Sequence, residues 1–348
     1  MYKSDQELQK IFKLAFQNLD TEKAKDFKHK EILNKAYADN NWESKINFMN
    51  LRHWDGQTDQ GSHANLTSEI YFNGFLFGFI KFIYKICVKR NRNIEIRDNF
   101  SDDMSIIKSI GGLDILQNCK IEDTYGLTYK GKINGIYVNN RWLRYVYLAT
   151  QIRNKELIKD EGIWVDIGSF YGGLQGITYA YSSNLRIILV DFQHQLLRSF
   201  IYLSNTQPKA KHFINPDINE RFENPGFYYI QPENISNYKN LKIDLLTNFF
   251  SFGELTRENF EDYVSSDLLK NSEKIFTVNR FISSPFFEPT YNNDITILDY
   301  LQTKSHLVQY FNEFPINHNM RVKRDLFGRN KYRAPSSNYF ELILKRII

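Results

Sequence analysis

The sequence predicts an α/β protein, with a mainly helical N-terminal domain followed by a domain built on a largely parallel sheet. In the first half, apolar residues recur at helical spacing. From about residue 160, short apolar runs alternate with helix-length segments, which is typical of βαβ units. One of these runs ends in a glycine-bearing turn. We therefore expect two domains, residues 1–159 and 160–348.

Composition narrows the class of protein. Hydrophobic residues make up 42% and charged residues 24% of the 348 residues, as in ordinary folded proteins. The formal net charge of +5 is modest, and a nucleic-acid-binding domain is normally more basic, so no nucleic-acid partner is expected. The two cysteines, Cys87 and Cys119, fit neither a metal site nor a disulfide framework. A cytoplasmic location is the simplest expectation.

Two segments bear on membranes. Residues 1–16 carry charges among their apolar residues and do not read as a signal peptide. Residues 70–88 approach the length of a membrane span, about 20 residues. Asn73, Lys81 and Lys85 lie inside this stretch, and charges there are costly in a bilayer. A buried helix is favoured over a membrane-surface or partner-binding helix, and no transmembrane span is expected.

The individual elements follow from the same periodicities. Helices are expected at residues 5–18, 21–39, 68–89, 101–119 and 142–158, with polar loops at 50–65 and 124–140. Seven strands are expected, at residues 162–167, 185–190, 226–230, 242–248, 274–279, 307–311 and 338–346.

The turn after the first strand is the strongest local signal. The strand ends in Asp166, and a turn containing Gly168 and Gly172 then opens a helix. Glycine allows positive φ and a close approach of backbone to a ligand, and a helix N-terminus offers unpaired N–H groups. On its own, such a turn is also compatible with a dinucleotide site.

A second acid narrows the class of ligand that this turn is expected to bind. Asp191 ends the next strand, 23 positions after Gly168, where a carboxylate accepts hydrogen bonds from ribose hydroxyls. Phe192 follows and could pack against an adenine ring. The alternative is that Asp191 caps the next helix. Together the two acids and the turn favour a nucleoside ligand.

The identity of that nucleoside depends on Phe170. It stands where the dinucleotide pattern has the glycine that admits a pyrophosphate. S-adenosyl-L-methionine has no pyrophosphate, and Asp166 before the glycine suits the ammonium group of an amino acid. Both observations favour S-adenosyl-L-methionine over a nicotinamide cofactor.

Three blocks resemble class I S-adenosylmethionine-dependent methyltransferases, and more narrowly the bacterial sugar O-methyltransferases of surface polysaccharide biosynthesis. They are DIGSFYGG (166–173), LLTNFFSFGEL (245–255) and FTVNR (276–280), and Leu143-Arg144-Tyr145 resembles the segment before the first strand. The resemblance covers residues 135–285, and Phe170 departs from the family's usual glycine. It implies a Rossmann-like sheet of seven strands, the last antiparallel, and O-methylation of a sugar or glycan precursor.

The expected cofactor site lies at the carboxyl edge of the sheet, where ligands bind in open α/β folds. We expect Gln231 near the adenine, and Asn248 and Phe249 beside the transferred methyl group. The full set of expected cofactor-binding residues is Asp166, Gly168, Ser169, Phe170, Tyr171, Gly172, Asp191, Phe192, Gln231, Asn248 and Phe249.

Three residues are candidates for catalysis on the acceptor. Glu254 is expected to start a helix at this edge, as a general base or merely as an acid complementing the helix dipole. His318 follows a strand at the same edge, whereas His306 precedes that strand at the opposite edge. His53 lies in a loop that could close over the acceptor. Asn279 is expected to hold a sugar hydroxyl or to satisfy the backbone at its strand end.

A basic segment, residues 321–333, carries six cations against one acid. Its arginines suit phosphate oxygens, so Arg321, Arg324 and Arg329 are expected to bind a nucleotide-linked or phosphorylated acceptor. The alternative is a solvated loop. No cluster of acids and histidines indicates a metal site.

Two other functions stay open from the residues alone. One is methyl transfer to another small polar acceptor, such as a phosphate-type group or an amine. The other is a catalytically inactive cofactor-binding subunit that serves a partner. A homodimer is left open as the assembly.

Overall fold

The computed structural model describes part of the chain: residues 94–98, 100–120, 131–214, 216, 222–238, 240–283, 294–301, 305–316, 319–324, 330–335 and 339–347. The expected helices at 5–18, 21–39 and 68–89, the loop at 50–65 and the membrane-length stretch at 70–88 lie outside these residues. So do His53, His318 and Arg329. Among the described residues, no helix is long and apolar enough to cross a membrane.

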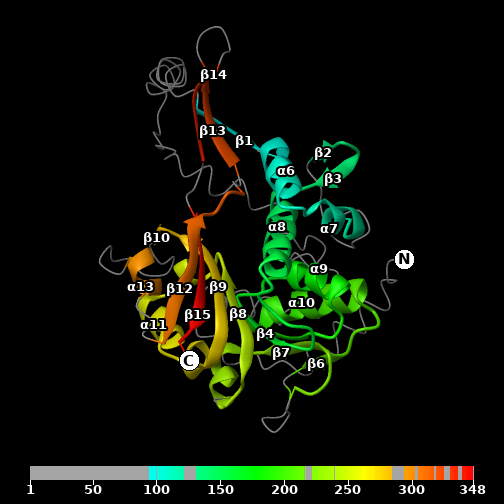
Figure 1. Cartoon of the computed structure of the whole chain (residues 1–348), viewed down its shortest axis with the longest axis vertical. Helices are drawn as coiled ribbons and strands as arrows, with labels where there is room; N and C mark the ends of the chain where they lie inside the picture. Colours follow the sequence, from blue (N-terminus) through cyan, green and yellow to red (C-terminus); the bar gives the residue numbers. More distant parts are fainter. Residues whose placement is uncertain are drawn as a thin grey trace, which may run out of the picture.

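The centre of the molecule is an eight-stranded sheet in the order β12-β15-β9-β8-β4-β5-β7-β6 (Figure 1). Its strands pair in parallel except β15, which is antiparallel to both of its neighbours. The bounds are β4 Ile163–Ile167, β5 Arg186–Val190, β6 His212–Ile214, β7 Gly226–Ile230, β8 Ile243–Phe249, β9 Ser272–Arg280, β12 His306–Glu313 and β15 Tyr339–Arg346.

All seven expected strands are present, but the expected total of seven is wrong. The eighth strand, β6, is a three-residue edge strand that pairs with β7. Its residues are only half-buried, so it has no continuous apolar run that periodicity could detect. The remaining seven strands run 3-2-1-4-5-7-6 and the last one is antiparallel, as the family resemblance implies.

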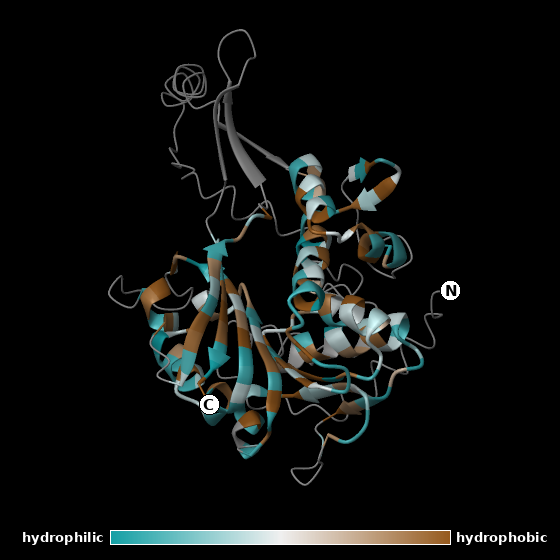
Figure 2. Cartoon of the chain, in the orientation of Figure 1, coloured by the Kyte–Doolittle hydropathy of each residue, from teal (hydrophilic) through white to brown (hydrophobic). Residues whose placement is uncertain are grey.

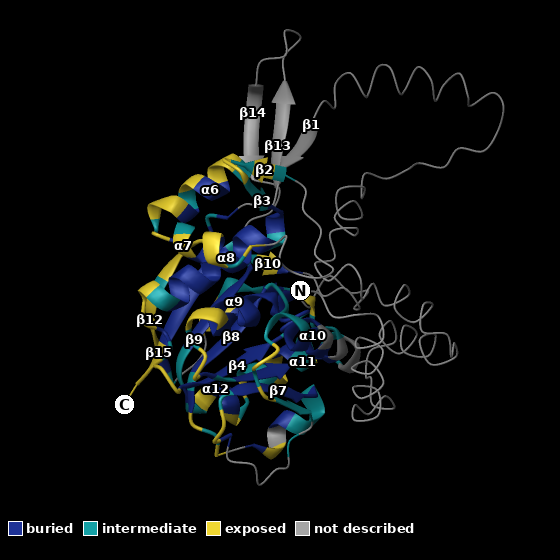
Figure 3. Cartoon of the chain, turned by 90° about the vertical axis from the view of Figure 1, so that its right-hand side faces the viewer, coloured by how far each residue is buried: buried dark blue, intermediate teal, exposed yellow. Residues whose placement is uncertain are grey.

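Each face of the sheet has its own hydrophobic core. On one face lie α8 (Asn140–Asn154), α9 (Gly173–Tyr181) and α10 (Gln193–Thr206). On the other lie α11 (Arg257–Val264), α12 (Asp267–Asn271), α13 (Ile297–Leu301) and the 3-10 turns η3 (Pro232–Asn237) and η4 (Phe252–Glu254). Hydrophobic positions follow the strands, and the buried residues concentrate in the sheet and in α8 and α9 (Figures 2 and 3).

The helical segment before the sheet differs from the expectation in detail. The single helix expected at 101–119 is two helices, α6 (Phe100–Ser109) and α7 (Leu113–Asn118). Gly111, at φ +78°, and Gly112 separate them, and a Cβ on Gly112 would lie 2.5 Å from Thr150 Oγ1. The expected loop at 124–140 contains a hairpin, β2 (Gly131–Ile133) and β3 (Ile136–Val138). Its turn residues, Asn134 and Gly135, both have positive φ, as a type I′ turn requires.

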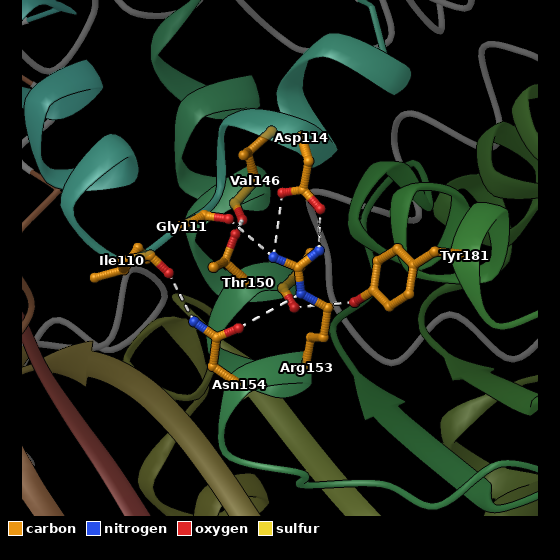
Figure 4. Close-up of polar contacts among 9 residues, drawn as sticks. Ile110, Gly111, Asp114, Val146, Thr150, Arg153, Asn154 and Tyr181 are labelled. Carbon is orange, nitrogen blue, oxygen red and sulfur yellow. Dashed lines mark hydrogen bonds and ion pairs between the residues drawn. The ribbon is translucent and has the colours of Figure 1, made fainter.

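Hydrogen bonds and an ion pair connect α7 and the turn before it to the C-terminal end of α8 (Figure 4). The Arg153 guanidinium donates to both oxygens of Asp114, at 2.5 and 3.2 Å, and to the Gly111 carbonyl at 2.9 Å. Asn154 donates to the Ile110 carbonyl, and Tyr181 on α9 donates to the Ala149 carbonyl. One hydrophobic core continues from α6 and α7 through α8 to the sheet. The domain boundary near residue 159 stays a prediction.

A second, three-stranded antiparallel sheet contains β1 (Ile94–Asp98), β13 (Asn319–Arg324) and β14 (Asn330–Pro335). The basic segment lies between β12 and β15, and its described positions form a strand hairpin rather than a loop. Because β12 runs parallel to β9, the chain leaves β12 at the carboxyl edge of the main sheet (Figure 1). A short pair, β10 (Ile282–Ser283) and β11 (Ile295–Thr296), completes the described strands.

Candidate cofactor and acceptor site

Two glycines shape the turn after β4. Gly168 has φ +80°, and a Cβ there would lie 2.1 Å from the Oγ of Ser251. Gly172 has φ +82° at the start of α9, and a Cβ there would lie 2.8 Å from Leu203. The Gly168 N–H donates to the Val190 carbonyl at 2.8 Å, which binds the turn to the end of β5. Both positions thus require glycine.

Phe170 occupies this turn with a positive φ of 54°, which costs a side-chain-bearing residue about 1–3 kcal/mol. Its N–H donates to Asp191 Oδ2 at 2.8 Å, and its carbonyl accepts from Ser199 at 2.6 Å. The guanidinium groups of Arg141 and Arg198 lie 4.4 and 5.7 Å from its ring centroid. These contacts explain how a phenylalanine can occupy the position where the family that the sequence resembles usually has glycine.

Asp166 is buried at the end of β4, with 3% exposure. Its two oxygens accept hydrogen bonds from Thr247 Oγ1 and Gln175 Nε2. Trp164 orients Thr247 by donating to the same hydroxyl at 2.7 Å. Burial, helped by the nearby Asp191 carboxylate, raises the pKa of Asp166 to about 8 against the two hydrogen bonds. Without a cation beside it, Asp166 therefore keeps its proton at neutral pH.

Asp191 lies next to the turn, after β5. Its oxygens accept from the backbone N–H groups of Phe170 and Phe192, each at 2.8 Å. Helix α10 begins with Phe192 at its N-cap, so Asp191 does not cap this helix. Burial raises the pKa of Asp191 to about 7, although both backbone hydrogen bonds oppose the shift. A carboxylate has about four acceptor positions, so two remain for a ligand.

Two polar atoms beside these acids have no protein partner among the described residues. They are Ser169 Oγ, in the turn, and Gln175 Oε1, in the first part of α9. Buried polar atoms in native proteins nearly always have hydrogen-bond partners. A polar ligand at this turn would supply them, so the residues present fit a nucleoside with an amino-acid tail.

The other expected cofactor residues fall into two groups. Gln231 is buried directly after β7, and Phe192 is half-buried after β5, so both lie at the carboxyl edge. Tyr171 is instead fully buried among rings, 5.7 Å from Tyr145 and 4.9 Å from Tyr202 between centroids. Phe249 is buried against Phe276.

Asn248 and Asn279 belong to one buried network. Asn248 Nδ2 donates to the Ile167 carbonyl at 2.8 Å and to Ser251 Oγ at 2.5 Å. Its Oδ1 accepts from Asn279 Nδ2 at 2.9 Å and from the Phe252 N–H at 3.1 Å. Asn279 also donates to Thr277 at 2.6 Å. This network connects the ends of β4, β8 and β9, and Asn279 donates within it to side chains. Its expected role, holding a sugar hydroxyl or satisfying the backbone at its strand end, stays a prediction.

Glu254 is exposed at the same edge, but it does not start a helix. It ends the 3-10 turn η4, and α11 begins three residues later with Thr256 as its N-cap. Burial is the main influence on the pKa values of Asp191 and Arg280, and the charge of Glu254 adds a smaller upward effect on both. His306 lies at the opposite edge, as expected, with its Nε2 2.8 Å from the Ser272 carbonyl oxygen.

The structure adds a group that sequence reasoning missed, consisting of Arg144, Phe250, Arg280 and Tyr339. Phe250 follows β8 with φ 66°, and its ring centroid lies 5.0 Å from that of Tyr339. Arg144, on α8, lies over both rings, at 4.5 Å from Phe250 and 5.3 Å from Tyr339. Arg144 and Arg280 each fall within a block of family resemblance, but no local pattern indicates that they meet. Among the described residues, no three metal-ligating side chains gather.

No family model matches this chain, and no curated protein matches it. Solved structures do. A Thermoplasma acidophilum protein is 10% identical, with 59% of this chain and 89% of that chain covered and a TM-score of 0.38. A SAM-dependent methyltransferase of Anabaena variabilis is 12% identical, covering 60% and 86%, with a TM-score of 0.37. Magnesium protoporphyrin IX methyltransferase of Synechocystis, with bound SAH, is 9% identical, covering 60% and 84%, also at 0.37.

Proposed function

We propose that this protein is an S-adenosyl-L-methionine-dependent methyltransferase. The observation that carries the proposal is the turn after β4, where Gly168 tolerates no side chain and Asp191 accepts two backbone N–H groups. Ser169 Oγ and Gln175 Oε1 are buried there without partners. This arrangement lies at the carboxyl edge of a sheet with class I methyltransferase order.

Each residue of the site has a distinct task in this proposal. Asp166 pairs with the ammonium group of the methionine tail, and Asp191 accepts the ribose hydroxyls. Phe192 and Gln231 flank the adenine. Asn248 holds the ends of β4 and β8 in position through its hydrogen bonds.

The cofactor supplies an activated methyl group, so the protein has only to align the acceptor and remove a proton. Alignment contributes several kcal/mol, and a general base typically accelerates a reaction 10²–10⁴-fold. Glu254 is our candidate for the base, because it is exposed at this edge and near Asp191. His53 and His318 remain further candidates from the sequence.

For the acceptor, we propose a hydroxyl of a sugar or glycan precursor of bacterial surface polysaccharide, methylated in the cytoplasm. The support is the resemblance of residues 166–173, 245–255 and 276–280 to sugar O-methyltransferases. In this proposal Arg321, Arg324 and Arg329 contact phosphates of a nucleotide-linked acceptor. Their segment is inserted between β12 and β15, at the edge where the acceptor would bind.

Calorimetry on the full chain tests the cofactor. We expect micromolar-range binding of S-adenosylmethionine or S-adenosylhomocysteine and a strong loss in Asp191→Ala, because the ribose hydroxyls would lose their acceptor. Binding of NAD together with no binding of either sulfur ligand would refute the proposal. Mass spectrometry of cellular glycans and sugar nucleotides, with and without the protein, tests the acceptor.

A further inference from the structure

Arg144 is a buried cation: burial lowers its pKa, and the charge of Asp103 acts against that shift. Its side chain is 9% exposed, and its Nε has no hydrogen-bond partner. Its contacts are the faces of Phe250 and Tyr339, and no carboxylate within the described part of the chain forms an ion pair with it. Burying a charge is costly unless it is paired, and ring faces replace only part of the lost hydration. A guanidinium in this position is therefore suited to an anion from outside the protein.

A second guanidinium approaches the same ring. Tyr339 on β15 pairs directly with Arg280 on β9, and the Arg280 guanidinium lies 5.9 Å from the Tyr339 ring centroid. Although burial acts in the opposite direction, the charges of Arg144 and Arg280 hold the pKa of Tyr339 below its ordinary value. Two cations thus converge on one phenol.

This group lies on the acceptor side of the cofactor turn. Phe250 directly follows the last residue of β8, and its N–H donates to the Val278 carbonyl at 2.7 Å. Asn248, two residues earlier, donates to the carbonyl of Ile167 next to Gly168. The charge of Glu254, an exposed residue, acts on Arg280 and favours its charged form. The position beyond β8 and β9 is therefore basic, adjoins the turn and is separate from the β13–β14 hairpin in sequence.

We propose that Arg144 and Arg280 form an oxyanion-binding subsite for the methyl acceptor, beside the Tyr339 ring that both guanidinium groups approach. The acceptor is then an acidic molecule, a sugar that carries a carboxylate or a phosphate close to the hydroxyl to be methylated. The inference rests on the proposed methyltransferase function and specifies its substrate class. Planar guanidinium groups bind both anions through paired N–H donors, whereas a neutral sugar would leave Arg144 unpaired.

Calorimetry with three probes tests this subsite on the full chain saturated with S-adenosylhomocysteine. The probes are glucuronate, glucose 6-phosphate and glucose. We expect at least one anionic probe to bind at least about tenfold more tightly than glucose, since charge-assisted hydrogen bonds dominate. The tighter of the two identifies the carboxylate or the phosphate as the preferred group.

Two variants and a matched control assign the effect to these arginines. Arg144→Gln and Arg280→Gln should each weaken the anionic probe about 10- to 100-fold and leave S-adenosylhomocysteine affinity unchanged. Arg346→Gln, an exposed arginine at the other end of β15, should change neither. Because Arg144 is buried, Arg280→Gln serves as the decisive variant if Arg144→Gln does not fold.

The subsite proposal is wrong if glucose and both anionic probes bind equally well. It is also wrong if Arg280→Gln binds the anionic probe with wild-type affinity. Repeating the probe titrations without S-adenosylhomocysteine distinguishes failure of the oxyanion subsite from failure of the proposed methyltransferase function. If S-adenosylhomocysteine does not bind at all, the proposed function fails, whatever the anion result. If it binds and the anions do not, only the oxyanion subsite fails.

Discussion

The proton on Asp166 makes cofactor affinity depend on pH. In the free protein, burial raises its pKa to about 8, so the carboxyl is mostly protonated below neutrality. Pairing with the ligand's ammonium group favours the charged carboxylate and lowers that pKa. Binding must then release a proton. Between about pH 5.5 and 7.0 the proton of Asp166 alone should raise the affinity by up to about tenfold per pH unit, or about thirtyfold over the window.

The upper limit of this window comes from Asp166, because above its pKa of about 8 the carboxyl is already ionised before the ligand binds. The α-amino group of the ligand stays charged throughout the window. Asp191, with a pKa of about 7, can release a second proton when it accepts ribose hydroxyls. In Asp191→Asn, the affinity for the ligand should therefore still rise with pH because of Asp166, although this variant binds the ligand more weakly.

Asp166→Asn is the matching substitution because the site can accommodate an amide. Gln175 donates through Nε2 and has a free Oε1, so its amide can turn and accept from the new side chain. We expect Asp166→Asn to bind S-adenosylhomocysteine more weakly at neutral pH. Its affinity should also lose the rise with pH that Asp166 causes. Since the folded-state pKa of Asp166 is raised, its contribution to stability is complete below its unfolded pKa, about 3.9, and is lost as pH rises through about 8. The free variant should thus be more stable than wild type near pH 8.

Isothermal titration calorimetry in two buffers of different ionisation enthalpy counts the released protons. S-adenosylhomocysteine is the ligand, and thermal unfolding of the free proteins monitors folding. The reasoning is refuted if wild-type affinity does not change between about pH 5.5 and 7.0. An unchanged slope in Asp166→Asn would equally exclude Asp166 as the source.

Four further predictions concern other parts of the site and its support. Gly168→Ala should destabilise the protein by about 1–3 kcal/mol or more in denaturant unfolding and weaken S-adenosylhomocysteine binding, because its φ is +80° and Ser251 blocks a Cβ. Glu254→Gln and His318→Ala should lower turnover more than cofactor affinity; unchanged turnover in both would remove them as candidates. Arg324→Ala should raise the KM for a nucleotide-sugar acceptor and weaken its salt dependence, unless the segment is only a solvated hairpin. Glu341 is buried between two tyrosine hydroxyls and has a raised pKa, so Glu341→Gln should raise the melting temperature at neutral pH, an increase that should shrink toward pH 4.

The sheet could be predicted because its strands are continuous apolar runs bounded by polar residues. The strand at Gly226–Ile230 matches its prediction, and the other six differ by no more than two residues at either end. The break between α6 and α7 was missed, since the helical spacing continues across it while Gly111 and Gly112 interrupt the backbone. Two neighbouring glycines within an expected helix were the available signal.

Site residues were predictable where a local backbone requirement marks them and not where tertiary packing brings them together. Gly168 is marked by its positive φ, and Asp191 by its place at a strand end. Arg144 and Tyr339 are 195 positions apart, and they meet only because α8 packs against the sheet while β15 pairs with β9 in one register.

One regularity nevertheless connects the two parts of the site. The neighbouring strands β4 and β8 are each followed by a phenylalanine with positive φ, Phe170 and Phe250. An arginine from the first two turns of α8 lies over each ring, Arg141 over Phe170 and Arg144 over Phe250. The spacing of these arginines, three residues apart on one helix, places both on the same face. A single helix therefore covers the cofactor turn and the adjoining basic group together, so a substitution that shifts α8 should disturb both at once.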